Sequence, residues 1–209
     1  HNTMPTSILI LSIGFVLWAA LHSFSASTYV KVWVRGLLGQ NADRWYRLLY
    51  GFLSVITLLP LLVLLAVLPD QMLYVVPTPW NWVVRGVQGL AVVGLVVAFW
   101  EADPLDFLGV AQLQATRQPN SDRLRIRGMH CWVRHPLYSM SILLIWMTPT
   151  MTANWLIICL FATVYFVVGS MHEETRLVDE FGQAYIDYQK QVPRLIPRPG
   201  HCYQPNTLS

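Results

Sequence analysis

The stretch RHPLYSMSILLIWMTPTMTANWLIICLFATVYFVVGSMHEE, residues 134–174, decides the fold. It holds two apolar runs, 137–148 and 154–170, separated by a turn of five residues. Arg134-His135 stands before the first run and Glu173-Glu174 follows the second. The runs predict a helical hairpin in a membrane, where each arm can satisfy its own backbone hydrogen bonds. Ionisable groups at the edge of a membrane are costly, so the flanking residues are candidates for a functional site.

The composition agrees with a membrane protein. Of 209 residues, 55% are hydrophobic and only 12% are charged, and the mean hydropathy is +0.44. A soluble domain carries about 25% charged residues. Nine Trp and nine Tyr suit the two interfacial belts of a membrane protein. The net charge of +3 is small and indicates no nucleic-acid partner.

Three further apolar runs precede the hairpin: Ile8 to Phe24, Tyr46 to Leu68 and Val83 to Trp100. A span needs about 20 apolar residues, and each run comes near that length. We therefore predict an all-α integral membrane protein with five transmembrane helices, the last two forming the hairpin. Pro60 is expected to kink the second span, and Pro136 suits the first turn of the fourth. The first run lacks a basic flank and a clear cleavage site, so we interpret it as a retained helix.

The basic residues predict an orientation. Of the 14 Lys and Arg residues, all but Arg85 fall in the first loop, the third loop or the C-terminal tail. Under the positive-inside rule these segments are cytoplasmic. We expect the N-terminus outside, the C-terminus and both polar clusters inside, and a bacterial inner membrane as the location.

The segment from Glu173 to Gln191 changes character. Leu177, Phe181, Tyr185 and Tyr188 recur at helical spacing, and polar residues fill the opposite side. This pattern predicts an amphipathic cytoplasmic helix, interrupted by Gly182, that lies on the membrane or folds over a site.

The sequence argues against several other sites. Three cysteines, at 131, 159 and 202, are too few and too scattered to predict a disulfide framework or a zinc site. The six histidines show no metal-ligand spacing, so no metal is expected. G-x-G-x-x-G and Walker motifs are absent. We expect residues 1–3 and the tail after Gly200 to be foreign to the native chain.

An ordered series of motifs resembles a known superfamily. The series is Gly128, Arg134-His135-Pro136-x-Tyr138, Glu173-Glu174-x-x-Leu177, Phe181-Gly182-x-x-Tyr185-x-x-Tyr188 and Val192-Pro193-Arg194. Over residues 124–197 the chain resembles the isoprenylcysteine carboxyl methyltransferase and phospholipid methyltransferase superfamily. Asp106 to Gly109 and the turn Thr148 to Thr152 are similar to its bacterial methanethiol S-methyltransferase branch.

The resemblance implies an integral membrane enzyme that uses S-adenosylmethionine. Family members hold this cofactor at the cytoplasmic end of the last two spans, with the C-terminal segment folded over it. A lipophilic acceptor enters from the bilayer. We expect one membrane domain over residues 1–209, in which 4–116 form the first three spans and their loops. Residues 117–200 then form the cofactor-binding hairpin and C-terminal segment.

The resemblance also implies which residues bind the cofactor. They are Gly128, Arg134, His135, Pro136, Tyr138, Glu173, Glu174, Tyr185, Tyr188 and Arg194. An arginine suits the cofactor's carboxylate, and a glutamate suits its ammonium or ribose hydroxyls. Tyrosine rings suit the adenine or, by a cation–π contact, the sulfonium.

The expected catalytic candidates are Arg134, Glu174, His130 and His22. His130 stands where the family commonly has a Tyr, two residues after the glycine. A thiol acceptor would benefit from a base that raises its thiolate fraction. The sequence leaves His22, His130 and Glu174 unranked for that role. Each also has a structural alternative, such as an interfacial anchor for Arg134.

The acceptor stays open. A small thiol is favoured by the turn motif, and a phosphatidylethanolamine-type amine and a prenylcysteine carboxylate are the alternatives. Outside this class, an NADPH-dependent membrane reductase or a haem- or quinone-binding accessory protein are the competing hypotheses. Membrane lipid is an expected partner, and the sequence does not reveal an oligomeric state.

Overall fold

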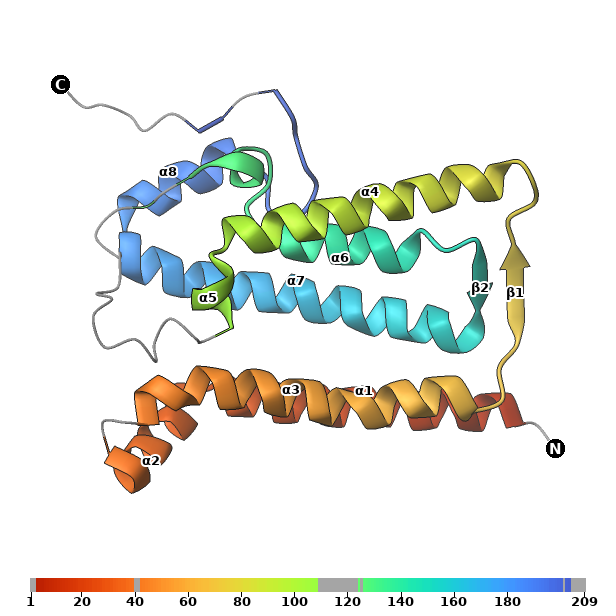
Figure 1. Cartoon of the computed structure of the whole chain (residues 1–209), viewed down its shortest axis with the longest axis horizontal. Helices are drawn as coiled ribbons and strands as arrows, with labels where there is room; N and C mark the ends of the chain where they lie inside the picture. The colour runs from red at the N-terminus through yellow and green to blue at the C-terminus, as the bar shows by residue number, and fades with distance from the viewer. Residues whose placement is uncertain (1–2, 40–41, 109–123, 125, 201, 204–209) are drawn as a thin grey trace. The chain divides into compact units, whose positions relative to one another are not determined.

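The computed structural model describes residues 3–39, 42–108, 124, 126–200 and 202–203. The chain is mostly helical (Figure 1). Its elements are α1 (Thr3–Ala26), α2 (Thr28–Leu38), α3 (Ala42–Val67), β1 (Met72–Val75), α4 (Trp80–Glu101), α5 (Pro104–Phe107), η3 (Gly128–Cys131), α6 (Pro136–Trp146), β2 (Thr150–Thr152), α7 (Ala153–Phe181) and α8 (Gln183–Gln191). The predicted motif from Asp106 to Gly109 runs beyond the described residues.

Four helices are long and apolar enough to cross a membrane: Met4–Ala26, Trp45–Val67, Trp80–Glu101 and Ala153–Phe181. Their apolar side chains are widely exposed, for example Leu17 at 64% and Val63 at 57%, as expected for surfaces that face lipid. The protein is therefore a membrane protein. The predicted count of five spans is not confirmed, because α6 has only 11 residues. At 1.5 Å per residue it is about half as long as the bilayer core is thick.

The contacts divide the chain into two compact units. The first contains the chain up to Val76 with residues 102–117 and 150–161, and the second contains 77–101, 118–149 and 162–209. The continuous helix α7 contributes residues to each. The expectation of one membrane domain stays a prediction.

In the first unit α1 packs against α3. Leu11 and Leu61 are buried, and a Cβ on Gly14 would lie 3.3 Å from Leu61 Cδ1. The absent side chain at Gly14 thus lets the two helices approach closely. Pro60 lies inside α3, as the sequence shows, and its kink stays a prediction.

The same unit contains a two-stranded antiparallel sheet that the all-α prediction missed. Val75 pairs with Thr150, and Met72 with Thr152. Asp70 supports the pairing, because its Oδ1 accepts the backbone N–H groups of Gln71 at 2.7 Å and Asn154 at 3.0 Å. The residues predicted as the hairpin turn thus form β2. Strands of three and four residues carry too little local pattern to be recognised.

The predicted first loop contains a helix, α2, which the apolar runs do not predict. Ser27 caps α2, and its Oγ accepts the Val30 N–H at 3.4 Å. Tyr29 and Trp33 on this helix are exposed. An amphipathic helix with exposed aromatic residues is typical of the membrane interface.

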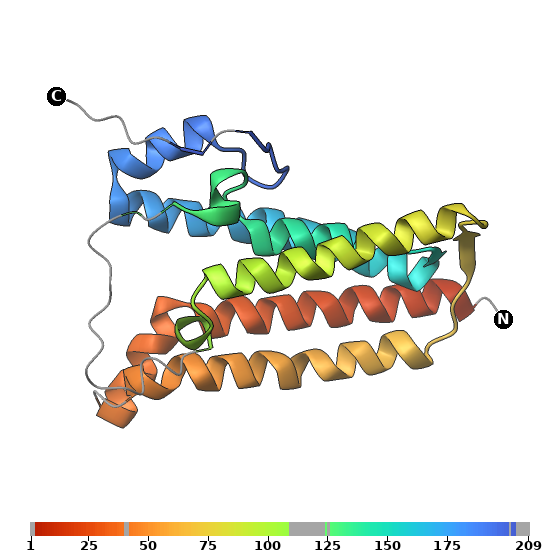
Figure 2. The same ribbon diagram turned by 45° about the horizontal axis from the view of Figure 1, so that its top comes forward.

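In the second unit α4 packs along α6 (Figure 2). A Cβ on Gly94 would lie 2.6 Å from Met140 Sδ, so this glycine permits the close contact. Pro136 occupies the first turn of α6, as predicted. The N–H groups of a first turn have no partner within the helix, so the proline, which lacks one, is tolerated there.

The amphipathic segment predicted as one interrupted helix is two helices. Its first part extends α7 to Phe181, and Gly182 then adopts a φ of 57° before α8 begins. A glycine reaches this left-handed region without the steric cost that a Cβ adds. The amphipathic helix is thereby shortened to Gln183–Gln191.

Cys131 and Cys202 form a disulfide, which the sequence analysis did not expect. The bond joins η3 to the C-terminal segment. Tyr203 packs its ring 5.5 Å from that of Tyr188 and donates its hydroxyl to the Ala184 carbonyl at 3.4 Å. The expectation that the tail after Gly200 is foreign to the native chain stays a prediction. Cys159 is buried and is not part of a disulfide.

Gly94→Val should lower the thermal midpoint of the detergent-solubilised protein. The new methyl groups crowd Met140, and overpacking of this kind costs about 1–3 kcal/mol. Gly89→Val on the same helix is the matched control, because a Cβ there meets nothing within 4 Å. Equal midpoints for the two variants would contradict the close packing of α4 on α6.

Loss of the disulfide should destabilise the second unit. The bond spans 71 residues, and a loop of this length stabilises the folded state by about 4 kcal/mol in the chain-entropy model. Cys131→Ser, Cys202→Ser and the double variant should unfold at the same lowered temperature in thermal scans. A reductant should lower the midpoint of the unsubstituted protein alone; an unchanged midpoint would show that the bond does not form.

Candidate active site

The two polar clusters that flank the hairpin in sequence meet at Glu174. Arg134 donates from Nε to Glu174 Oε1 at 2.7 Å and from a terminal nitrogen to Oε2 at 3.2 Å. Arg194 donates to Oε2 through two nitrogens, at 3.0 and 3.2 Å. His135 Nε2 lies 3.1 Å from Oε1, and the Gln189 amide donates to Oε2 at 3.0 Å. One carboxylate thus binds four side chains from three separate segments.

Local backbone structure places these groups. His135 is the residue before the first turn of α6, so Arg134 lies outside the helix and its side chain is free to turn toward α7. The Arg134 N–H donates to the Pro193 carbonyl at 2.9 Å, and the His135 N–H to the Arg194 carbonyl at 3.2 Å. This short backbone pairing fixes the C-terminal segment beside the start of α6.

Arg134 also closes the end of α8. Its guanidinium donates to the Gln189 carbonyl at 2.7 Å and to the Val192 carbonyl at 2.9 Å. The last carbonyls of a helix lack intrahelical donors and favour a cation. The Arg134 guanidinium therefore connects α7, α8 and the C-terminal segment after α8.

The central groups of the cluster are buried. The exposed fractions of the side chains are 8% for Arg134, 3% for Glu174 and 6% for His135. Such a charge is tolerated because every ionised group has hydrogen-bonded partners. Arg194 is different, with 33% of its side chain exposed. It is the cation of this cluster that can also reach a ligand.

Glu173 lies on a more open side. Its side chain is 46% exposed, and its Oε2 accepts the Tyr138 hydroxyl at 3.1 Å. His135 Nδ1 lies 3.5 Å from the same oxygen, so the imidazole stands between the two carboxylates. The rings of His135 and Tyr138 are stacked with centroids 5.4 Å apart. Glu173 thus retains acceptor capacity for a bound molecule.

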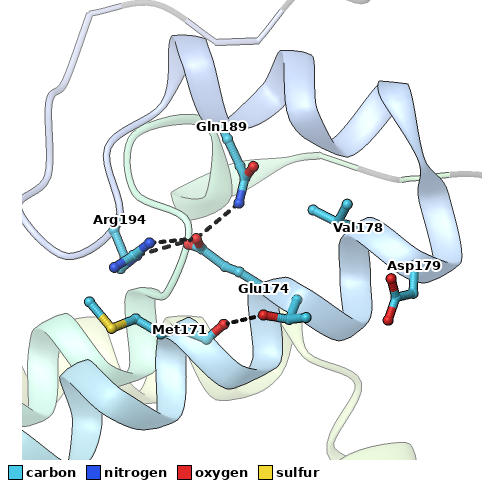
Figure 3. A pocket seen from close by; sticks show the side chains of 7 residues that line it. Met171, Glu174, Val178, Asp179, Gln189 and Arg194 are labelled. Carbon is cyan, nitrogen blue, oxygen red and sulfur yellow. Dashed lines mark hydrogen bonds and ion pairs between the residues drawn. The ribbon is translucent and has the colours of Figure 1, made fainter.

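A cavity of about 370 Å³ opens beside Glu174. It is lined by Met171, Glu174, Thr175, Val178, Asp179, Gln189 and Arg194. Figure 3 shows Arg194 and Gln189 reaching Glu174 on one side, with Val178 and Asp179 on the other. Small-molecule sites are typically of this size and combine apolar walls with a few polar groups.

Tyr185 and Tyr188, both on α8, are not among the residues that line the cavity. They form a buried apolar core with Val192. Tyr188 donates its hydroxyl to the His130 carbonyl at 2.6 Å. Burial raises the pKa of both phenols, so they stay neutral hydrogen-bond donors. Packing is the role that the structure describes for them, and their predicted contact with a cofactor stays a prediction.

Gly128 is explained by its neighbour. It has a φ of 58°, and a Cβ on it would lie 1.8 Å from Glu101 Oε1. Glu101 accepts the Met129 N–H through both oxygens, at 2.9 and 3.2 Å. Sequence reasoning missed Glu101 and Gln189. A signal existed for Glu101, since it is an ionisable residue at the end of an apolar span.

The two remaining histidine candidates have different surroundings. His130 Nδ1 lies 3.7 Å from Glu101 Oε2 in the second unit. Burial lowers the pKa of His130, and the charge of Glu101 offsets part of that effect. His22 belongs to the first unit, where its Nε2 lies 2.6 Å from the Tyr50 hydroxyl and its ring stacks on Trp18. Its predicted catalytic role is untested by these contacts.

Among the residues that the structure describes, no group of three His, Cys, Asp or Glu side chains is arranged to hold a metal ion. The arrangement as a whole presents cations, carboxylates and apolar walls to a small polar molecule.

The chain is similar to several curated proteins. It is 29% identical over 207 residues to the methanethiol S-methyltransferase of Pseudomonas sp. (strain GM41(2012)), covering 94% of this chain and 75% of that protein. It is 31% identical over 210 residues to methanethiol S-methyltransferase 2 of Bradyrhizobium diazoefficiens, covering 94% and 76%. Over a shorter stretch of 71 residues the chain is 38% identical to the methanethiol S-methyltransferase of Mycobacterium tuberculosis. That match covers 34% of this chain and 29% of that protein. No family model and no solved structure matches the chain.

Glu174→Ala should unfold at a much lower temperature than the parent protein. Removing the carboxylate leaves Arg134 buried without its anion, a change that costs about 3–5 kcal/mol. Asp187→Ala is the control, because that carboxylate bonds the exposed side chains of Lys190 and Gln183, and its loss should barely move the midpoint. Comparable shifts in the two thermal scans would show that the cluster is not a structural centre.

Proposed function

Because the chain belongs to the family of membrane methyltransferases that includes the methanethiol S-methyltransferases, we propose that it transfers a methyl group from S-adenosylmethionine to a small thiol. The relative that is 31% identical along nearly the whole chain carries this proposal. The site residues of the wider isoprenylcysteine carboxyl methyltransferase and phospholipid methyltransferase superfamily are part of the same proposal.

The cavity beside Glu174 fits the cofactor in its chemistry. S-adenosylmethionine is a zwitterion with a sulfonium, and when bound it supplies an activated methyl group. Arg194 offers a partly exposed guanidinium for the carboxylate, and the exposed carboxylate of Asp179 suits the ammonium or the ribose hydroxyls. Glu173 lies outside this lining and is proposed as a further contact because its carboxylate is also exposed. Met171 and Val178 give apolar walls.

The chain's own residues would act mainly by positioning. Arg134 and Glu174 hold α7, α8 and the C-terminal segment in one geometry, so the donors that face the cavity keep fixed directions. Alignment of two bound reactants accelerates a displacement strongly. No residue needs to form a covalent intermediate.

The orientation of the protein is proposed from its basic residues. We place the N-terminus outside and the cluster around Glu174 on the cytoplasmic side of a bacterial inner membrane. A small thiol or a membrane-soluble acceptor then reaches the site from the bilayer or the cytoplasm. A phosphatidylethanolamine-type amine and a prenylcysteine carboxylate are the alternative acceptors.

The purified protein should bind S-adenosylhomocysteine at one site in calorimetric titration and should not bind NADPH. Arg194→Ala should weaken this binding by about tenfold or more, because a charge-assisted bidentate contact contributes at least 1.5 kcal/mol. Lys190→Ala is the matched control, since Lys190 is exposed and pairs with Asp187 instead.

The acceptor is tested by supplying methyl-labelled S-adenosylmethionine with methanethiol, phosphatidylethanolamine or a prenylcysteine. Label should appear in dimethyl sulfide, measured by gas chromatography. Transfer to the amine or the carboxylate alone would replace the thiol by that acceptor, and binding of NADPH alone would overturn the methyltransferase proposal.

A further inference from the structure

Glu101 is a largely buried carboxylate at the end of an apolar helix. It is the last residue of the apolar helix α4, and its side chain is only 19% exposed. A carboxylate is costly there unless it is well partnered. Both of its oxygens accept the Met129 N–H, and Gly128 leaves the space that a Cβ would fill. The Glu101 carboxylate thus fixes the backbone of the loop that precedes α6.

The residue that this loop presents is His130. Its backbone is held on both sides, because its N–H donates to the Arg127 carbonyl at 3.2 Å and its carbonyl accepts the Tyr188 hydroxyl. The next residue, Cys131, is fixed by the disulfide. The imidazole itself is 34% exposed and turns Nδ1 toward Glu101 Oε2, 3.7 Å away. A backbone fixed this firmly under a partly open ring suggests a role for the ring.

The negative charge of a nearby carboxylate favours the histidine tautomer whose proton faces it. With the proton on Nδ1 facing Glu101, Nε2 carries the lone pair and is available as a base. This is the arrangement that a reaction with a weakly acidic thiol requires, since the thiolate is the nucleophile.

We propose that His130 is the base that deprotonates the thiol acceptor, and that Glu101 is the positioning residue that orients its ring. This inference rests on the proposed function and names the base for it. The S–H bond breaks and its proton goes to Nε2. The sulfur electron pair forms the new bond to the methyl carbon, whose bond to the sulfonium breaks. The products are a thioether, S-adenosylhomocysteine and an imidazolium that returns its proton to solvent.

The surrounding charges allow His130 to act near neutral pH. Burial lowers the pKa of His130, Glu101 on α4 and Glu173 on α7 raise it, and His135 lowers it. The Tyr188 hydroxyl on α8 donates its hydrogen bond to the backbone carbonyl of His130 and not to the imidazole. Because the net pKa lies below its ordinary value, the ring is neutral at pH 7. Activity should therefore fall only as the pH drops below the usual histidine range.

The test compares acceptors of different acidity. With an alkanethiol, His130→Ala should lower kcat/KM by about 100-fold or more, the range of general-base catalysis. With an acidic aromatic thiol, already a thiolate at pH 7, the same variant should lose little. Added imidazole should restore part of the alkanethiol activity. His172→Ala, at an exposed position on α7, should behave as the parent protein with both acceptors.

Glu101→Gln tests the positioning role, because the amide oxygen can still accept the Met129 N–H while the charge is lost. The acid limb of its alkanethiol pH profile should move to lower pH. The His130 ring signal in NMR titration of histidine-labelled protein should shift in the same direction. Should this variant fail to fold, the same two measurements on Glu101→Asp replace it, with a smaller shift expected.

Separate outcomes overturn the two proposals. Equal losses with both thiols in His130→Ala, or an unmoved pH limb and NMR titration in the Glu101 variant, would remove His130 and Glu101 from the reaction. Binding of S-adenosylhomocysteine should be unchanged in the His130 variant. Absence of that binding, or of thiol methylation, in the parent protein would instead overturn the proposed function.

Discussion

One buried carboxylate organises the second unit. Glu174 neutralises Arg134 and part of Arg194, and Arg134 in turn binds the carbonyls that end α8. Each of these groups would be costly in a poorly hydrated place on its own, and together they are tolerated. The constraint is therefore mutual: the helix end, the C-terminal segment and the start of α6 can take their positions only with this charge between them.

Tight local packing serves the same end. Gly128 and Gly94 lack side chains where Glu101 and Met140 approach, and Gly182 turns the chain from α7 into α8. Gly128 brings the Glu101 carboxylate to the Met129 N–H, and Gly94 lets α4 approach α6. A side chain at either position would force these groups apart.

Much of this could be predicted from sequence, and the exceptions have physical reasons. The apolar runs and the proline that begins α6 follow from local pattern. The ordered motifs place Arg134 and Glu174 at the same end of the hairpin, but their direct ion pair was not predicted. The sheet of β1 and β2 depends on pairs of residues 75 to 80 positions apart, and short strands carry little pattern of their own. The disulfide depends on a C-terminal segment returning to η3, which cysteine spacing cannot reveal. The role of Glu101 could not be predicted because its hydrogen bonds go to the backbone N–H of Met129, which no side-chain pattern reveals.

The bond between Cys131 and Cys202 closes a covalent ring that contains α6, α7 and α8. A peptide bond cut anywhere in that ring, for example at the exposed turn around Gly182, would leave both pieces attached. On a gel run without reductant such a nicked molecule keeps its full mass, and its helices stay at high effective concentration. A single band of full mass on a non-reducing gel therefore does not show that the backbone is intact. A reduced sample is needed to reveal a cleaved chain.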